Sequence, residues 1–424
     1  MNKKNNIKNI CMLSTHGYFD PVPQLGRTDT GGQVVYVLEL SKALSKNGFN
    51  VDIYTRWFDK SKKQIDIVPG YPNVRVIRIP AGTWNFILKE QIYDVLAELV
   101  KNMIKFIKDN NLKYDLFHGH YVDAGIVAVD VAKTFNKPCF FTPHSLGAWK
   151  RDQMSGNKEE MEKKYNFKYR IKEEIRVFKS VNGMTLTTKL QMEKLNKLYN
   201  YYADNSSIIS PGVDIYRFHP IKMNKNKKQI KTNLPNKYIL CLSRIDTNKG
   251  HDLLLNAFDI VRKEIDDIYL VIGGGSPNPK QREINIFNKI NSITKEKCMG
   301  EKVKIIGYVS DKLLVTYYQQ SQLFVLPSIF EPFGMTATEA MACDKTVVAS
   351  KFGGIRNIIT NGENGLLVDP ANPEEFANAI IKLLKNTKLR KQIGQNACDN
   401  IKKNYSWQAI ANKHLSFYNK FMKS

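Results

Sequence analysis

Residues 323–350 read LFVLPSIFEPFGMTATEAMACDKTVVAS, and this stretch decides the fold. Leu323–Leu326 and Val347–Ser350 are short apolar runs that predict buried strands, and a helical pattern follows Gly334 between them. Two buried strands joined through a helix are typical of a parallel sheet, because parallel neighbours need a long crossover connection. The stretch therefore predicts an α/β fold.

The same alternation of strand and helix extends along all 424 residues. In the first half, the runs that predict strands are Ile7–Ser14, Val51–Thr55, Val74–Ile79, Leu116–His118, Cys139–Thr142, Gly183–Thr187 and Ser207–Ile209. In the second half they are Tyr238–Ser243, Tyr269–Gly273, Val303–Ile306, Leu323–Leu326, Val347–Ser350 and Leu366–Val368. So long a chain exceeds what one hydrophobic core usually supports, which favours two domains.

The Lys- and Asn-rich stretch Ile221–Asn233 has almost no apolar content and predicts a linker. We therefore expect domains at 1–220 and 234–405, a linker at 221–233, and a C-terminal helix within 406–424 that packs back on the first domain. Two doubly wound, Rossmann-like domains would enclose a cleft, where ligands of such folds usually bind.

The net charge of +24 raises the possibility of a nucleic-acid surface. Lys and Asn are enriched together throughout, which looks like coding bias, and no nucleic-acid-binding module is found, so we expect no nucleic-acid partner. The six cysteines are scattered without zinc or disulfide spacing. The N-terminus is polar and basic, and no apolar run is long enough for a membrane span, so we expect a cytoplasmic protein.

Two short motifs suit an anionic ligand. Gly31-Gly32 precedes a helical pattern, and paired glycines at a helix start let a ligand approach free backbone N–H groups. Arg244 and Lys249 follow the strand Tyr238–Ser243, at the carboxyl end where open α/β sheets bind ligands. Each motif alone is weak, because a helix-start turn or a solvated charged loop has the same pattern.

The strongest motif is EPFGMTATE, from Glu331 to Glu339. Backbone amides of Gly334–Thr336 at the helix start could hold a phosphate, and Glu339 could accept two ribose hydroxyls. A rival interpretation makes the two carboxylates a general acid/base pair, as in glycosidases.

His144 follows the strand Cys139–Thr142, and four other polar residues lie near strand ends or helix starts of the same half: Lys89, Asp123, Lys150 and Arg170. No Asp-x-Asp follows a strand and no His cluster has metal-ligand spacing, so we expect no metal site. Arg244, Lys249 and helix dipoles would then neutralise a diphosphate.

Taken together and in order, these motifs resemble the family-four retaining glycosyltransferases of the GT-B type. The resemblance runs from STHGYFDP at Ser14 to the final helix and is carried by TGGQVVYVLELSKAL, HYVDAG, TPHSLGAWK, YNFKYRIKEE and EPFGMTATEAMA. Within the family the chain is most similar to the sucrose-phosphate synthase and mannosylfructose-phosphate synthase branch. One departure is Leu88 before Lys89, where relatives often have Pro.

The resemblance implies roles for individual residues. Those implied in catalysis are Gly32, His144, Arg244, Lys249 and Glu331. Those implied in donor binding are Gly31, Gly32, His144, Arg244, Lys249, Glu331, Phe333, Gly334, Met335, Thr336 and Glu339. Those implied in acceptor binding are Gln33, Lys89, Tyr121, Asp123, Ser145, Lys150 and Arg170, whose three cations suit a 6-phosphate.

The implied reaction moves a hexose, with retention, from a nucleotide diphosphate sugar (GDP-mannose or UDP-glucose) to a sugar phosphate such as fructose 6-phosphate. The departing phosphate would take the acceptor proton, no cofactor beyond the nucleotide sugar would be needed, and a phosphatase could be a partner. Alternatives are another acceptor (inositol phosphate, a polysaccharide or a lipid-linked glycan) and a nucleotide-sugar epimerase on the same architecture.

Overall fold

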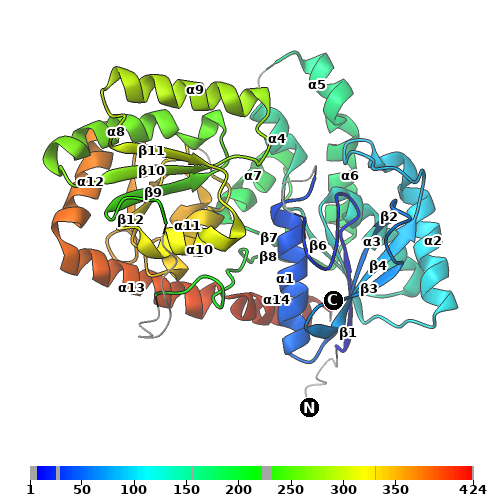
Figure 1. The fold of residues 1–424 in the computed structure, drawn as a ribbon. Helices are drawn as coiled ribbons and strands as arrows, with labels where there is room; N and C mark the ends of the chain where they lie inside the picture. Colours follow the sequence, from blue (N-terminus) through cyan, green and yellow to red (C-terminus); the bar gives the residue numbers. More distant parts are fainter. Residues whose placement is uncertain (1–6, 25–28, 155, 222–231, 330, 423–424) are drawn as a thin grey trace. The chain divides into compact units, whose positions relative to one another are not determined.

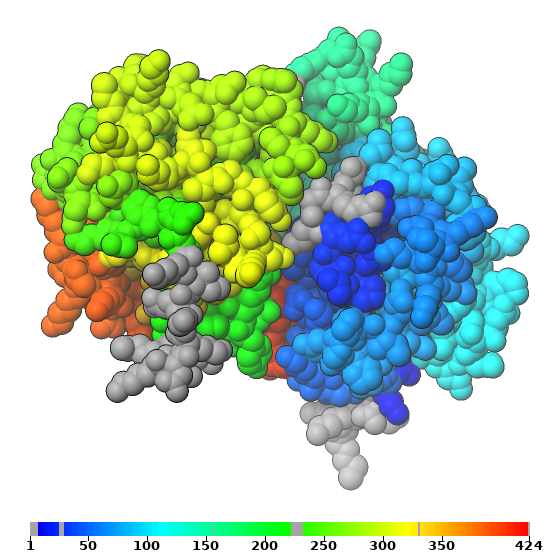
Figure 2. All heavy atoms as spheres, viewed as in Figure 1, coloured from blue at the N-terminus to red at the C-terminus, as the bar shows by residue number. Residues whose placement is uncertain are grey.

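The computed structural model describes residues 7–24, 29–154, 156–221, 232–329 and 331–422. They form two compact units: unit 1 runs up to Gly212 and resumes at Trp407, and unit 2 spans Val213–Ser406. In Figures 1 and 2 unit 1 is coloured blue to green with a red C-terminal segment, and unit 2 green to orange. Most of the predicted linker, residues 222–231, lies outside the described residues.

Unit 1 is built on an eight-stranded sheet with the order β3-β4-β2-β1-β5-β6-β7-β8. Every neighbouring pair is parallel except β3 and β4, which are antiparallel. The strands are β1 (Asn9–Leu13), β2 (Asn50–Trp57), β3 (Ile65–Val68), β4 (Tyr71–Pro80), β5 (Leu116–His120), β6 (Cys139–Thr142), β7 (Gly183–Leu186) and β8 (Ser206–Ile208). The sequence did not predict β3, an edge strand whose Ile65 and Ile67 are exposed.

The helices of unit 1 are α1 (Gly32–Lys46), the 3-10 helix η1 (Ile92–Val95), α2 (Leu96–Asp109), α3 (Val122–Phe135), α4 (Gly147–Asp152), α5 (Lys158–Tyr165), α6 (Phe167–Ser180), α7 (Lys189–Tyr199) and α14 (Trp407–Phe421). α14 lies beside α1 (Figure 1) and contributes Trp407, Ile410 and Phe417 to the core around β1 and β2. Its Trp407 packs on Gly212, where a Cβ would come within 2.5 Å of the indole.

The sequence places the first domain boundary at 220, whereas the units divide eight residues earlier, after Gly212. Val213 belongs to unit 2 because it pairs with Ser406 and its N–H donates to the Tyr405 carbonyl, at 2.8 Å.

Unit 2 is built on a six-stranded, fully parallel sheet with the order β11-β10-β9-β12-β13-β14. The strands are β9 (Tyr238–Ser243), β10 (Tyr269–Gly274), β11 (Val303–Gly307), β12 (Leu323–Leu326), β13 (Val347–Ser350) and β14 (Leu366–Val368). The helices are η2 (Thr247–Lys249), α8 (His251–Glu264), α9 (Gln281–Glu296), α10 (Asp311–Gln320), α11 (Met335–Ala342), η3 (Gly354–Asn357), α12 (Pro373–Lys385) and α13 (Thr387–Asn404). The prediction of an α/β fold with two parallel sheets is confirmed.

Strand order places the candidate residues at the carboxyl edges of the two sheets. In unit 1 most of them follow β1, β5 and β6, which are neighbours in the sheet, whereas Lys89 follows β4 and Arg170 lies on α6. In unit 2 they follow β9 and β12, which are also neighbours. Carboxyl ends of parallel strands meet at one edge, so motifs far apart in the sequence come together there.

Candidate functional site

In unit 2 the central contact is an ion pair between the loops after β9 and β12. Lys249 is 4% exposed, and its Nζ lies 2.5 Å from Glu331 Oε2. Gly250 follows with φ +68°, and a Cβ there would lie 2.3 Å from the Pro327 carbonyl oxygen, so only glycine fits this crossing of the two loops. The sequence singled out both charges but not their pairing. Arg244, directly after β9, is exposed.

The start of α11 provides backbone donors beside this pair. Gly334 caps the helix with φ +93°, a left-handed conformation that favours glycine, and no acidic side chain occupies the first turn. The first amides of a helix have no intrahelical acceptor and carry the positive end of the dipole. Met335 and Thr336 therefore present N–H groups suited to an anionic oxygen, next to the buried Phe333.

Glu339, one turn further along α11, has a different partner. Its Oε2 accepts a hydrogen bond of 2.8 Å from the Tyr318 hydroxyl of α10. Burial raises the pKa of Glu339 to about 7, although the Tyr318 hydrogen bond favours the charged form. Glu331 pairs with a lysine, whereas Glu339 pairs with a tyrosine. These separate partners do not favour the interpretation in which the two carboxylates act as general acid and general base on one glycosidic bond.

In unit 1 the first turn of α1 is open. Gly31 and Gly32 are exposed, and among the described residues a Cβ at Gly31 would have no neighbour within 4 Å. Gln33 is anchored instead, because its Nε2 donates to Ser14 Oγ and to the His120 carbonyl, both at 3.1 Å. The described residues thus leave the amides at the helix start accessible to a ligand, while the Gln33 side chain is fixed to Ser14, directly after β1, and to β5.

His144 lies in the turn after β6 with φ +54°, and its Nε2 is 3.0 Å from Nδ1 of His120. Burial lowers the pKa of His144 to about 3, so its ring is neutral near pH 7. A neutral imidazole has one donor and one acceptor nitrogen, and the contact with His120 uses one of them. His120 is not among the predicted site residues, although HGH at 118–120 puts two imidazoles on one face of a strand.

The ring of His120 belongs to a larger buried cluster. It stacks on His118 at 4.3 Å, and His118 Nδ1 lies 2.6 Å from the Tyr418 hydroxyl of α14. His414, also on α14, has its Nε2 2.9 Å from the Tyr36 hydroxyl of α1. Helix α14 is thereby connected to the residues that support His144.

The predicted acceptor cations Lys89 and Lys150 converge on one carboxylate, Glu90. Glu90 Oε1 lies 3.5 Å from Lys89 Nζ and 3.6 Å from Lys150 Nζ, and Lys89 also pairs with Asp29. Burial lowers the pKa of Lys150, and Glu90 opposes that shift. The two lysines are brought together as expected of a phosphate site, but carboxylates now neutralise them. Sequence reasoning gave no signal for Glu90 or Asp29.

Arg170 is only 3% exposed and is already surrounded by protein groups. Its Nε donates to Glu174 at 2.9 Å, its Nη2 donates to the Ser145 carbonyl at 3.0 Å, and its guanidinium lies over the Tyr121 ring. Arg170 therefore holds together two other predicted acceptor residues, Tyr121 and Ser145. Glu174 is a further residue that the sequence did not single out.

Asp123 is fully buried at the start of α3. Its carboxylate accepts from the Thr15 hydroxyl and lies 2.9 Å from His16 Nδ1, in the loop after β1. In this structure it contacts neighbouring loop residues, and His16 in turn packs against Tyr121 at 4.8 Å.

Two further features concern metals and membranes. Among the residues that the structure describes, no three His, Cys, Asp or Glu side chains gather as metal ligands would. Within the same residues, no helix has the length and apolar character needed to cross a bilayer.

The chain matches known proteins over nearly its full length. Residues 30–217 match the family described as Glycosyltransferase Family 4, and residues 222–399 match Glycosyl transferases group 1. Mannosylfructose-phosphate synthase of Agrobacterium fabrum is 36% identical over 96% of this chain and 90% of its own length. D-inositol 3-phosphate glycosyltransferase of Corynebacterium diphtheriae is 30% identical over 96% and 94%.

Among solved structures, sucrose-phosphate synthase from Thermosynechococcus elongatus superposes with a TM-score of 0.78 at 27% identity, covering 98% of this chain and 99% of that one. The resemblance inferred from the motifs is confirmed. On this evidence the chain belongs to the family-four glycosyltransferases and has their GT-B fold of two Rossmann-like domains.

Proposed function

We propose that this enzyme transfers a hexosyl group from a nucleotide diphosphate sugar to a sugar phosphate, with fructose 6-phosphate as the first candidate acceptor. The observation that carries the acceptor class is the convergence of Lys89 and Lys150 on a single carboxylate in unit 1. The relatives named for mannosylfructose-phosphate and sucrose-phosphate synthesis support the same class. GDP-mannose and UDP-glucose are the two candidate donors.

On the donor side, Lys249, Arg244 and the amides at the start of α11 would stabilise the leaving diphosphate. Preorganised cations and helix N-termini act most strongly where charge develops in the transition state. The 2.5 Å ion pair with Glu331 fixes the Lys249 ammonium and leaves the second carboxylate oxygen of Glu331 to accept a donor-sugar hydroxyl. Glu339 would accept the ribose hydroxyls.

On the acceptor side, a phosphate would replace Glu90 between the two lysines. A phosphate carries more charge than a carboxylate and forms short charge-assisted hydrogen bonds, so the exchange is favourable where both lysines reach it. Gln33, Tyr121 and Ser145 would contact the acceptor. Arg170 and Asp123, which are buried in unit 1, would help to hold these acceptor-binding residues in position.

The transfer would proceed with retention and without a protein nucleophile. The bond from the anomeric carbon to the diphosphate oxygen breaks, the bond to the acceptor oxygen forms on the same face, and the acceptor proton passes to the departing phosphate. The Gly32 amide would contact the diphosphate and neutral His144 the donor sugar. We propose that cations and helix dipoles supply the charge stabilisation without a metal or further cofactor, and that a phosphatase consumes the product.

The test is a donor-by-acceptor screen of the purified protein. GDP-mannose, UDP-glucose and ADP-glucose are each offered with fructose 6-phosphate, glucose 6-phosphate or inositol 3-phosphate, with and without EDTA, and nucleotide release is measured. Release that requires fructose 6-phosphate, resists EDTA and gives the donor's own anomeric configuration by NMR is expected. Inversion, or loss of activity in EDTA, would contradict the proposed mechanism.

A second candidate acceptor is inositol phosphate, because relatives named D-inositol 3-phosphate glycosyltransferase are up to 30% identical over nearly the full chain. The lysine pair suits any phosphate monoester, so it does not separate the two acceptors. The inositol 3-phosphate arm of the screen does: release that depends on it and not on fructose 6-phosphate would replace the first candidate.

A further inference from the structure

Unit 2 has a polar pocket at the amino ends of its strands, whereas the proposed donor residues follow the carboxyl ends. The pocket has a volume of about 1110 Å³ and is lined by residues that precede the strands: Asn236 before β9, Gln322 before β12 and Thr346 before β13. Arg244 and Glu331 follow β9 and β12 at the other edge. β9 has six residues and so separates the two edges by about 20 Å.

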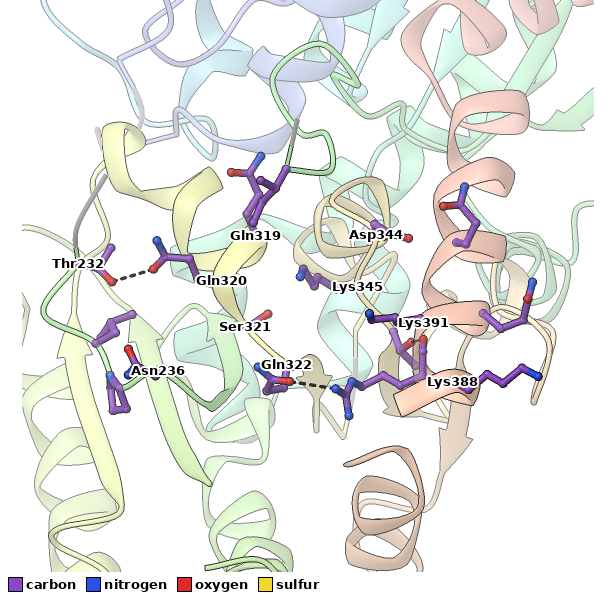
Figure 3. Close-up of a pocket in the computed structure, with 17 residues that line it drawn as sticks. Thr232, Asn236, Gln319, Gln320, Ser321, Gln322, Asp344, Lys345, Lys388 and Lys391 are labelled. Carbon is purple, nitrogen blue, oxygen red and sulfur yellow. Dashed lines mark hydrogen bonds between the residues drawn. The ribbon is translucent and has the colours of Figure 1, made fainter. Parts of the chain in front are cut away.

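The charge of the described lining is strongly positive. Lys345, Lys388, Arg390 and Lys391 face a single lining carboxylate, that of Asp344. Figure 3 shows the amino groups of Lys345 and Lys391 pointing into the space between the Gln319–Gln322 segment and α13. An anion placed there would meet cations from two separate elements.

The positive charges of these side chains are poorly balanced by negative groups of the protein. Lys388, Arg390 and Lys391 lie in the first turn and a half of α13, at the positive end of the helix dipole, and no acidic residue occupies that turn. Lys345 is half-buried, forms no ion pair among the described residues, and burial lowers its pKa. A bound anion would stabilise both the cations at the start of α13 and the half-buried Lys345.

The pocket also contains groups that suit hydroxyls. Gln319, Gln320 and Gln322 line it, and a glutamine amide has both donor and acceptor atoms. Arg390 is held in orientation by the Leu383 carbonyl at 2.9 Å and by Gln322 Oε1 at 3.0 Å, the latter drawn in Figure 3. Cations suited to a phosphate beside several glutamine amides match a ligand that carries both a phosphate and hydroxyl groups.

Two helices connect this pocket to the proposed donor site. Gln319 and Gln320 end α10, whose Tyr318 hydroxyl donates to Glu339. Asp344 and Lys345 follow α11, which carries Glu339, and the Lys345 N–H donates to the Ala340 carbonyl at 3.0 Å. A ligand that moves either helix end would alter the surroundings of the carboxylate that we assign to the ribose.

We propose that this pocket binds a small polyhydroxylated phosphate ester as an effector, separately from donor and acceptor. The effector role rests on the proposed function, whereas binding itself does not. Its effect would be a change in nucleotide affinity transmitted through α10 and α11.

The test compares variants of the full-length protein by calorimetry, with fructose 6-phosphate and inorganic phosphate as probes. Lys345→Gln/Lys391→Gln removes two pocket cations, and Lys402→Gln/Lys403→Gln removes two exposed lysines from the other end of α13 as a matched control. All variants carry Lys150→Ala, which weakens binding of both probes at the proposed acceptor site. The pocket variant should bind about tenfold or more weakly and the control normally. If the double pocket variant does not fold, the exposed Lys391→Glu replaces it.

The two probes distinguish binding of a phosphate ester, fructose 6-phosphate, from binding of free inorganic phosphate. The ester should bind more tightly. Equal weakening in the control variant, or no binding of either probe once Lys150 is replaced, would overturn the site. Unchanged nucleotide affinity with the pocket filled would overturn the effector role. Failure of sugar transfer in every donor and acceptor combination, with pocket binding intact, would instead refute the proposed function alone.

Discussion

Replacing Lys249 by Met tests whether this cation serves the leaving group or only the fold. The side chain of Lys249 is 5% exposed and that of its partner Glu331 17%, so the pair is intermediate between an exposed and a fully buried ion pair. Exposed pairs contribute 0–1 kcal/mol and breaking a buried pair costs roughly 3–5, which gives an expected loss of about 2 kcal/mol here. For a unit of this size, such a loss lowers the Tm by about 4–8 °C.

The loss of kcat in Lys249→Met should be larger than its loss of stability alone would cause. Removing one group that stabilises developing charge typically lowers kcat by about 10²- to 10³-fold. The double variant Lys249→Met/Glu331→Gln leaves no buried charge unpaired, so it should regain most of the stability but none of the turnover. The control is Lys289→Met, which breaks an exposed ion pair with Asp252 in the same unit and should change both quantities little.

Nucleotide release at saturating donor and acceptor gives kcat, and thermal unfolding followed by circular dichroism gives the Tm. A Lys249→Met enzyme within threefold of wild-type kcat would refute the leaving-group role. Recovery of turnover along with stability in the double variant would show that the lysine acts only through the fold.

Four more outcomes follow from the structure. Nucleotide affinity should rise about tenfold between pH 6 and pH 8, because the proposed ribose contact uses the charged Glu339 carboxylate and burial raises the pKa of that group to about 7. Titrations that show no pH dependence would contradict this. Lys150→Ala should raise the acceptor KM about tenfold or more with the donor KM unchanged, and steady-state kinetics with each substrate varied will decide. His120→Phe should lower kcat about tenfold in a protein of normal circular dichroism, because it removes the hydrogen bond to His144; an unaltered kcat would show that the bond is dispensable. Gly334→Ala should cost about 1–2 kcal/mol of stability and weaken nucleotide binding, since φ is +93° there, and urea unfolding measures the first effect.

Much of the fold could be predicted because apolar runs and helical periodicity are local signals. Every predicted strand is present in the structure, with ends that shift by a few residues at most. β3 could not be predicted, because its four residues, Ile65–Val68, follow a polar stretch and pair only with β4 at the sheet edge. Such a strand is defined by its partner and not by its own composition.

The candidate site could be predicted in its residues but not in its pairings. Lys249 and Glu331 are 82 positions apart, and no local pattern reports that they form an ion pair. The same holds for Glu90, which looks like any solvated charge until Lys150 is placed beside it. His120 is the exception, because the alternation in HGH can be seen in the sequence. Its contact with His144 depends on the neighbouring strand β6, which His144 follows.

The return of α14 to unit 1 has a consequence for the order of folding during synthesis. Unit 2 is one continuous segment, Val213–Ser406, whereas the core of unit 1 is incomplete until Trp407, Ile410 and Phe417 have been made. On the ribosome, where domains fold as they emerge, unit 2 can finish first although unit 1 begins earlier. Until then the apolar face of α1 that α14 will cover stays exposed, and nascent unit 1 is a natural client for chaperones.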